Sequence, residues 1–64
     1  MIVLSPTERR VFELFLAGHS VPRIADACGI SFYTVRAHLT ALMRKFGVRS
    51  RADLLYVASR GRQL

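Results

Sequence analysis

The side chains best suited to chemistry in this sequence are basic. Ten lysine and arginine residues stand against four acidic ones in 64 residues, which gives a formal net charge of +6. The interval between Asp26 and Asp53 holds no acid but five basic side chains: Arg36, Arg44, Lys45, Arg49 and Arg51. A basic block of this kind predicts a polyanionic partner, with nucleic acid first and an anionic membrane surface second. The alternative is a solvated basic face that binds no partner.

The other reactive side chains predict neither catalysis nor metal binding. Cys28 is the single cysteine, and with His19 and His38 it lacks the paired spacing of a zinc site. The sequence contains no glycine-rich phosphate loop, no carboxylate pair in reach and no base beside a plausible nucleophile. We therefore expect a protein that is not an enzyme and takes no cofactor. Cys28 is expected to be a small buried hydrophobe.

Serine and glycine residues divide the chain into four expected helices. Each helix follows a serine whose hydroxyl can accept a hydrogen bond from an unpaired backbone N–H: Ser5, Ser20, Ser31 and Ser50. Each expected helix is also followed by a glycine that can close its last turn: Gly18, Gly29, Gly47 and Gly61. The first start is the clearest, because Ser5-Pro6-Thr7-Glu8 is a capping box. The sequence predicts an all-α domain with helices near residues 6–17, 21–28, 32–46 and 51–60.

The third expected helix carries two opposed stripes. One recurs at helical spacing and is expected to face the core: Val35, Leu39, Leu42 and Phe46. The other holds only polar, basic or small side chains: Tyr33, Arg36, Ala37, Thr40 and Arg44. The preceding Gly29-Ile30-Ser31 is a three-residue turn between a short and a longer helix, which predicts a helix-turn-helix. In that arrangement the second helix lies in the DNA major groove.

The remaining expected helices complete the core and leave one apolar strip outside it. The core set is Val11, Phe12, Leu14 and Phe15 from the first helix, Ile24, Ala25 and Cys28 from the second, and Leu54 and Ala58 from the fourth. On the fourth helix Leu55, Tyr56 and Ser59 are expected to stay partly exposed. An exposed apolar strip on a small domain favours self-association. The alternative is that Leu55 and Tyr56 cover the C-terminal residues.

Several longer motifs occur in a fixed order. They are Leu4-Ser5-Pro6-Thr7-Glu8-Arg9, Gly18-His19-Ser20, Ile24-Ala25, Ile30-Ser31, Thr34-Val35-Arg36-Ala37-His38-Leu39 and Lys45-Phe46-Gly47-Val48-Arg49-Ser50-Arg51-Ala52-Asp53-Leu54. Together they resemble a LuxR-type (GerE/FixJ-type) DNA-binding domain of bacterial transcription regulators. The resemblance implies that residues 1–64 form one four-helix domain that recognises DNA through its third helix and frequently dimerises through its fourth. It also implies that such a domain can be the C-terminal part of a longer regulator, with an N-terminal sensor or receiver domain.

The resemblance assigns roles to individual residues. Arg36, Ala37 and Thr40 fall where family members touch base edges, and the planar fork of Arg36 suits guanine O6 and N7. The expected phosphate contacts, which set register without reading sequence, are Tyr33, Thr34, Arg44, Lys45, Arg49 and Arg51. For Arg36 the alternative is a solvated or intramolecular role. For Lys45 and Arg51 it is a solvent-facing charge at a helix end. For Tyr33 it is packing of the ring on Phe32. The expected dimer contacts are Leu55, Tyr56 and Ser59.

Three departures from the family pattern occur. Phe32-Tyr33 stands where the family commonly has an acidic–basic pair, Val21-Pro22-Arg23 replaces a polar segment, and Arg10 replaces a common acid. They leave the expected fold unchanged. They do affect which side chains are available for phosphate contacts at the starts of the second and third helices.

The function that these patterns predict is sequence-specific binding of double-stranded DNA for transcription regulation. The alternative is a protein-interaction adaptor or anti-activator built on the same fold, because fold alone does not fix function. The sequence has no secretory signal and no apolar run of the roughly 20 residues that a membrane span needs. We therefore expect a cytoplasmic protein without a membrane partner.

Overall fold

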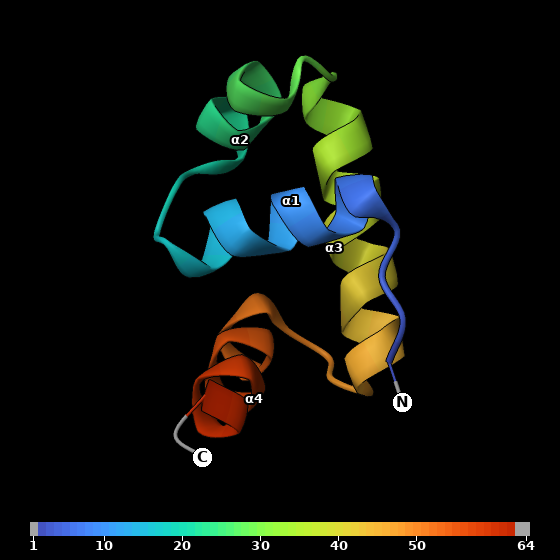
Figure 1. Ribbon diagram of the computed structural model, residues 1–64, viewed down its shortest axis with the longest axis vertical. Helices are drawn as coiled ribbons and strands as arrows, with labels where there is room; N and C mark the ends of the chain where they lie inside the picture. Colours follow the sequence, from blue (N-terminus) through green and yellow to red (C-terminus); the bar gives the residue numbers. More distant parts are fainter. Residues whose placement is uncertain (1, 63–64) are drawn as a thin grey trace.

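The polypeptide forms four helices joined by short connections (Figure 1). The computed structural model describes residues 2–62, and side chains as far as Arg60. Helix α1 spans Pro6–Leu16, α2 spans Val21–Cys28, α3 spans Phe32–Phe46 and α4 spans Arg51–Arg62. No strand occurs within residues 2–62. The all-α prediction is confirmed.

Two of the predicted helix ends are corrected by the structure. Helix α1 ends at Leu16, one residue before the predicted end, and Ala17 caps it. Helix α4 continues through Gly61 to Arg62, so the prediction that Gly61 follows this helix is wrong. A glycine inside a helix costs about 1 kcal/mol relative to alanine. That cost weakens a final turn without being enough to forbid it.

A serine hydroxyl caps the start of every helix. In each case the backbone N–H three residues after the serine donates to its hydroxyl, at distances between 3.0 and 3.5 Å, as predicted for Ser5, Ser20, Ser31 and Ser50. At α1 the Ser5 N–H also donates to Oε1 of Glu8 at 2.9 Å, which completes the capping box. The helix starts are therefore fixed by local hydrogen bonds.

The turn between α2 and α3 depends on Gly29, which lies in the left-handed region at φ +66° and ψ +34°. This conformation lets the N–H of Ile30 donate back to the carbonyl of Ala25 at 3.1 Å, a closure of the Schellman type. A Cβ added to Gly29 would meet no atom within 4 Å. The backbone conformation, and not crowding, therefore requires glycine here. Ser31 then begins α3, so the turn has the length predicted for a helix-turn-helix.

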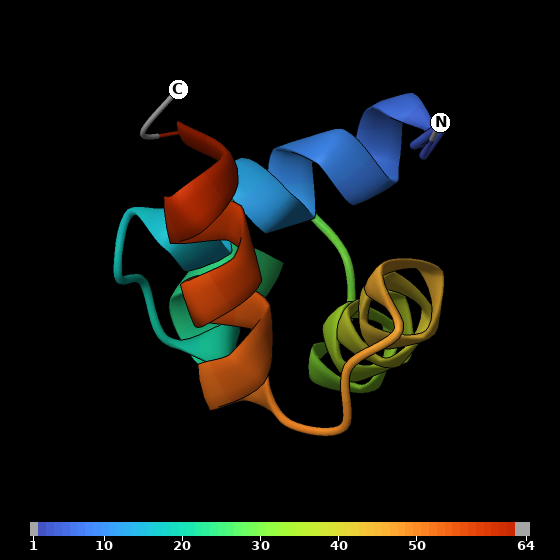
Figure 2. The same cartoon turned by 90° about the horizontal axis from the view of Figure 1, so that it is seen from below.

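The core is organised around α3. Six apolar side chains have no exposed surface: Val11, Ile24, Val35, Leu39, Leu42 and Leu54. Three of them belong to α3, which packs against each of the other three helices (Figure 2). Complete burial of one such side chain stabilises the fold by about 1.5–3 kcal/mol. One stripe of α3 therefore holds the domain together.

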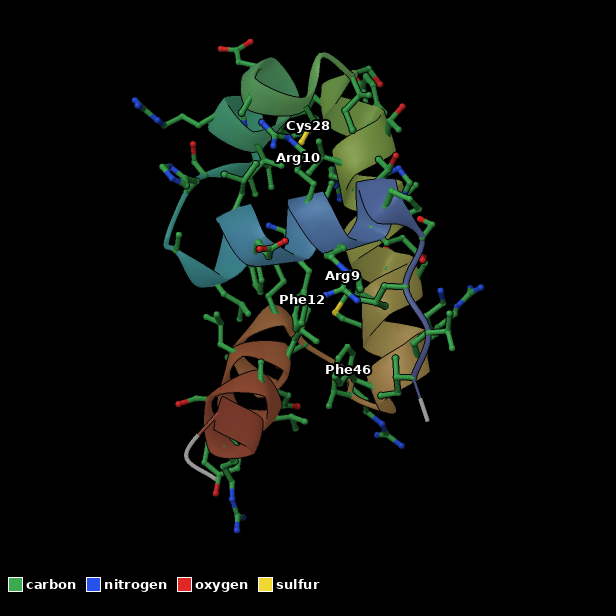
Figure 3. All side chains as sticks on the ribbon, in the orientation of Figure 1. Arg9, Arg10, Phe12, Cys28 and Phe46 are labelled. Atoms are coloured by element: carbon green, nitrogen blue, oxygen red, sulfur yellow. The ribbon has the colours of Figure 1, made fainter. Side chains whose placement is uncertain are left out.

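The edge of the core differs in detail from the predicted set. Phe46 is only half-buried, and its ring packs against that of Phe12 with the centroids 5.2 Å apart (Figure 3). Cys28 is also half-buried and packs against the core. Val21 is buried although it is absent from the predicted core. Its position three residues before Ile24 is the spacing that identifies a shared helix face.

One ion pair ties α1 to the last turn of α3. The ammonium of Lys45 lies 2.6 Å from Oε1 of Glu8 and also donates to the carbonyl oxygen of Val3 at 3.0 Å. The same carboxylate oxygen accepts the Ser5 N–H of the capping box. Glu8 is 8% exposed and is the one buried charged residue found in the described chain. A single carboxylate thus joins a helix cap, the segment before α1 and the end of α3.

These contacts favour the ionised form of Glu8. The Lys45 ammonium is the main reason why the pKa of this carboxyl lies below its ordinary value, and the Ser5 N–H is the second. Burial acts in the opposite direction. The unfolded chain lacks these contacts, so it takes up the proton at a higher pH than the folded chain does. The contribution of Glu8 to stability is therefore complete above the unfolded pKa and is lost as the pH falls through the folded pKa.

We predict that Glu8→Gln lowers the melting temperature at neutral pH, because the amide keeps the shape of the carboxylate but not its charge. The difference from wild type should shrink as the pH falls through the lowered folded pKa of Glu8, where the glutamate itself becomes neutral. Thermal unfolding followed by circular dichroism across this range measures the effect. Glu13→Gln, which removes the same charge from an exposed position on α1, is the control. An equal, pH-independent effect of the two substitutions would show that the Lys45 contact contributes nothing.

Candidate nucleic-acid interface

The outer face of α3 is free of other helices. Figure 2 looks along this helix, and α1, α2 and α4 all lie to one side of it. The three residues predicted to read bases, Arg36, Ala37 and Thr40, are exposed, whereas the opposite stripe of α3 is buried. The DNA major groove is about 12 Å wide and admits one α-helix with its side chains. The bare side of α3 has the shape and access that such docking needs.

The first turn of α3 is polar and free of acids. The hydroxyl of Ser31 accepts the backbone N–H of Thr34 at 3.0 Å, and the two hydroxyls lie 2.8 Å apart. No acidic residue lies in this turn, so the partial positive charge of the helix start is not neutralised locally. A helix start of this kind suits a phosphate oxygen. Thr34 is thus placed where a phosphate contact is predicted.

An aromatic pair stands beside Arg36. The Cζ atom of Arg36 lies 5.8 Å from the centroid of the Phe32 ring, which is within cation–π range. The Phe32 and Tyr33 rings meet edge to face, with centroids 5.7 Å apart and an angle of 85° between their planes. Phe32 is not among the residues assigned to the site from the sequence. Its spacing of four residues from Arg36, which places both on one helix face, is the signal that identifies it.

The predicted phosphate contacts fall into two groups. Tyr33, Thr34, Arg44, Arg49 and Arg51 are exposed. The ammonium of Lys45 already has the partners described above, so a phosphate would have to compete with a carboxylate for it. The phosphate contact of Lys45 stays a prediction, and so do the others. The two members of the ion pair stand 37 positions apart, so no local pattern links them in the sequence.

Helix α4 presents apolar side chains on its outside. Leu54 is buried and Ala58 is half-buried, as expected. Leu55 is 41% exposed and Tyr56 is 61% exposed, and Ser59 is also exposed. Val57, which the predicted strip did not include, is 37% exposed. The exposed apolar surface of α4 is therefore wider than the predicted strip.

Two arginines outside α3 make contacts within the domain. The guanidinium of Arg10 on α1 donates to the carbonyl of Ala27, near the C-terminal end of α2, at 3.4 Å. Arg10 thereby neutralises carbonyls at the negative end of that helix. On α4, Arg60 donates to the Tyr56 hydroxyl at 3.4 Å, and its Cζ lies 5.7 Å from the ring centroid. The Arg10 contact joins α1 to α2, whereas the Arg60 contact lies within α4.

Two surface hollows among the described residues lie away from the predicted DNA contacts. The first, of about 450 Å³, lies between α1 and α2 and is lined by Leu14, His19, Arg23, Asp26 and Ala27. The second, of about 490 Å³, is mostly apolar and involves α1, α4 and the segment before α1. Neither is lined by a residue predicted to contact DNA. In the described part of the chain no three potential metal ligands gather, and none of its helices could cross a bilayer.

The chain is similar to bacterial regulators over most of its length. Residues 2–58 match the family described as bacterial regulatory proteins, luxR family. The chain is 36% identical over 61 residues to the transcriptional regulatory protein TdiR of Thauera aromatica, covering 95% of this chain and 27% of TdiR. It is 40% identical over 63 residues to the nitrate/nitrite response regulator protein NarP of Escherichia coli, covering 95% of this chain and 29% of NarP.

A shorter relative is matched over more of its own length. The spore germination protein GerE of Bacillus subtilis is 40% identical over 51 residues, which cover 80% of this chain and 69% of GerE. The chain spans about a quarter of the length of TdiR. No solved structure matches the chain significantly.

The resemblance seen in the sequence is thus confirmed by a family match that includes α1, α2 and α3 and the first part of α4, as far as residue 58. The helix-turn-helix and the exposed basic face of α3 are the features through which such a domain binds DNA. The chain belongs to the luxR family of bacterial regulatory proteins, as a helix-turn-helix DNA-binding domain that serves transcription regulation.

Proposed function

We propose that this domain reads a specific double-stranded DNA sequence by placing α3 in the major groove, with Arg36, Ala37 and Thr40 at the base edges. The observation that carries the proposal is the division of α3 into a core-facing stripe, in which Val35, Leu39 and Leu42 are fully buried, and an exposed stripe without acids. Arg36 bonds guanine O6 and N7 with two parallel donors, Ala37 offers a methyl contact to thymine, and Thr40 offers a hydroxyl. No observation favours the alternative of an adaptor that binds only protein.

Phosphate contacts on both sides of α3 would supply most of the affinity. Tyr33 and Thr34 stand at its start and Arg44 and Lys45 in its last turn. Arg49 lies in the connection that follows, and Arg51 is the first residue of α4. Each cation that neutralises a phosphate releases counterions, so the binding constant falls steeply with salt. These contacts set the register of α3 on the duplex, and the base contacts then select the sequence.

We further propose that two copies bind together through α4, with Leu55, Tyr56 and Ser59 at the contact. The support is the exposed apolar surface of that helix, which is costly for a small domain to leave in water. A two-fold dimer presents its two α3 helices to half-sites related by the same symmetry. This arrangement makes half-site spacing a second source of selectivity.

A longer regulator, acting in the bacterial cytoplasm, is the setting that we propose for this domain. TdiR and NarP are several times longer than the chain, and the name of NarP describes a response regulator. A sensor or receiver domain before α1 would supply the regulatory input.

We predict that selection from a random duplex library enriches an inverted repeat whose half-sites contain a guanine at the position that Arg36 reads. Sequencing of the bound duplexes after several rounds at moderate salt measures this. A single unpaired motif would retain the reading role and remove the dimer. Salt-sensitive binding without any enriched motif would contradict sequence-specific recognition by this domain.

Arg36 and Arg44 should differ in what they contribute to binding. Arg36→Ala is expected to cost about 1–3 kcal/mol at the selected site and to relax preference at one base pair. Arg44→Ala should weaken binding to selected and random duplexes alike and reduce the salt slope by about one unit. Fluorescence anisotropy titrations of both duplexes at several salt concentrations measure these quantities. The division between reading and positioning would fail if the two variants behaved identically.

Substitution on α4 should break the dimer without unfolding the domain. Because Leu55 is 41% exposed, Leu55→Asp removes apolar contact area from the surface and not from the core. In sedimentation experiments we expect wild type to dimerise, at least on DNA, and Leu55→Asp to remain monomeric. Ala52→Asp, which adds a charge at an exposed position in the first turn of the same helix, is the matched control. Monomers for all three proteins, with and without DNA, would rule out the α4 interface.

A further inference from the structure

We propose that Phe32 is a specificity-determining positioning residue: its ring holds the guanidinium of Arg36 at the N-terminal end of α3, ready for a guanine. The inference rests on the proposed function, because it concerns how the base-reading arginine is presented. The observations that carry it are the 5.8 Å separation of Arg36 Cζ from the Phe32 ring centroid and the edge-to-face contact of Phe32 with Tyr33.

The direction of the contact follows from helix geometry. Long side chains in α-helices lean toward the N-terminus, over the turn before their own Cα atom. Arg36 therefore lies over the turn that contains Phe32, four residues earlier. The N-terminal residues of a recognition helix are those that meet base edges. The ring thus draws the guanidinium toward the end of α3 that enters the groove.

Within the described chain the Phe32 ring is the partner that orders Arg36. No hydrogen bond or ion pair from Arg36 to another described residue is present, and its helix has no acid in the first turn. A carboxylate partner would occupy the same N–H donors that a guanine needs. An aromatic ring attracts the cation through its π-face and leaves those donors free. The contact therefore orders the arginine without competing with the base.

The ring that holds Arg36 is itself held. Tyr33 meets it edge to face at 85°, a favoured geometry for aromatic pairs, and so limits its rotation. Phe32 is 41% exposed while Tyr33 is 77% exposed, so Phe32 is the inner member of the pair. An arginine ordered before binding loses less side-chain entropy when it docks. This gain is realised only where a guanine accepts both hydrogen bonds, so it should favour the specific site over random DNA.

The test compares Phe32→Leu, which keeps apolar bulk without a ring, with Phe32→Tyr, which restores the ring. Dissociation constants are measured for the selected site and for duplexes with the other base pairs at the Arg36 position. We expect Phe32→Leu to reduce the preference for the selected base pair about two- to fivefold. Binding to random DNA and the salt slope should keep their wild-type values. Phe32→Tyr should restore the preference, and Phe32→Leu should add nothing in an Arg36→Ala background.

Thermal unfolding of each variant shows whether the fold is intact, and a purely structural role for Phe32 would weaken binding to all duplexes equally. That outcome, or a wild-type preference in Phe32→Leu, overturns the inference while leaving the proposed function in place, provided that Arg36→Ala still loses the preference. If the wild-type protein selects no motif at all, both the proposed function and this inference are wrong.

Discussion

Helix α3 can bury only one of its faces against the other helices, and the rest of the structure follows from that constraint. Val35, Leu39 and Leu42 have no exposed surface because α1, α2 and α4 all pack on the same side of α3. A fourth neighbour on the opposite side would cover Arg36 and Thr40. The hydrophobic effect thus produces the free face by gathering the other elements on one side. Stability and recognition are two results of one asymmetric packing.

Electrostatics reinforces the same division. The acid-free interval from α2 to α4 leaves the outer face of α3 positive, whereas the buried carboxylate of Glu8 lies on the inner side and binds Lys45. A buried charge is tolerable when it is paired and hydrogen-bonded, and Glu8 meets both conditions. The one basic side chain that is paired in this way lies in the last turn of α3 and reaches back to the chain before α1. Arg36, Arg44, Arg49 and Arg51 remain exposed at the surface.

Much of this arrangement could be predicted from the sequence because its determinants are local. A serine cap and a left-handed glycine each act within a few residues, so the starts of all helices and the closing of α2 can be recognised from residue type and spacing. The seam of α3 is a simple periodicity. The contact between Lys45 and Glu8 could not be predicted, because it depends on how α1 crosses α3. Gly61 shows a limit of prediction from local residue type, because a glycine favours the end of a helix but does not by itself end one.

The site was predictable to a similar depth. Which face of α3 is exposed follows from the apolar stripe, and every predicted contact residue is exposed in the structure. The contacts that those residues make within the domain were harder to predict from the sequence. The pairing of Phe32 with Arg36 needs a choice of rotamers, and the tether on Lys45 needs the tertiary fold. Side-chain partners at a surface depend on geometry that residue type alone does not specify.

The two connections on either side of α2 contain almost no slack. One residue separates Gly18 from Ser20 and one separates Gly29 from Ser31, and each connection is closed by a hydrogen bond back into the preceding helix. A connection that consists of one helix cap followed by the next has few torsions left to vary. Helices α1, α2 and α3 should therefore meet DNA as a rigid body, with their mutual angles already set. Under that condition the duplex, and not the protein backbone, must bend or twist to improve the fit, so the flexibility of the DNA sequence becomes part of what this protein selects.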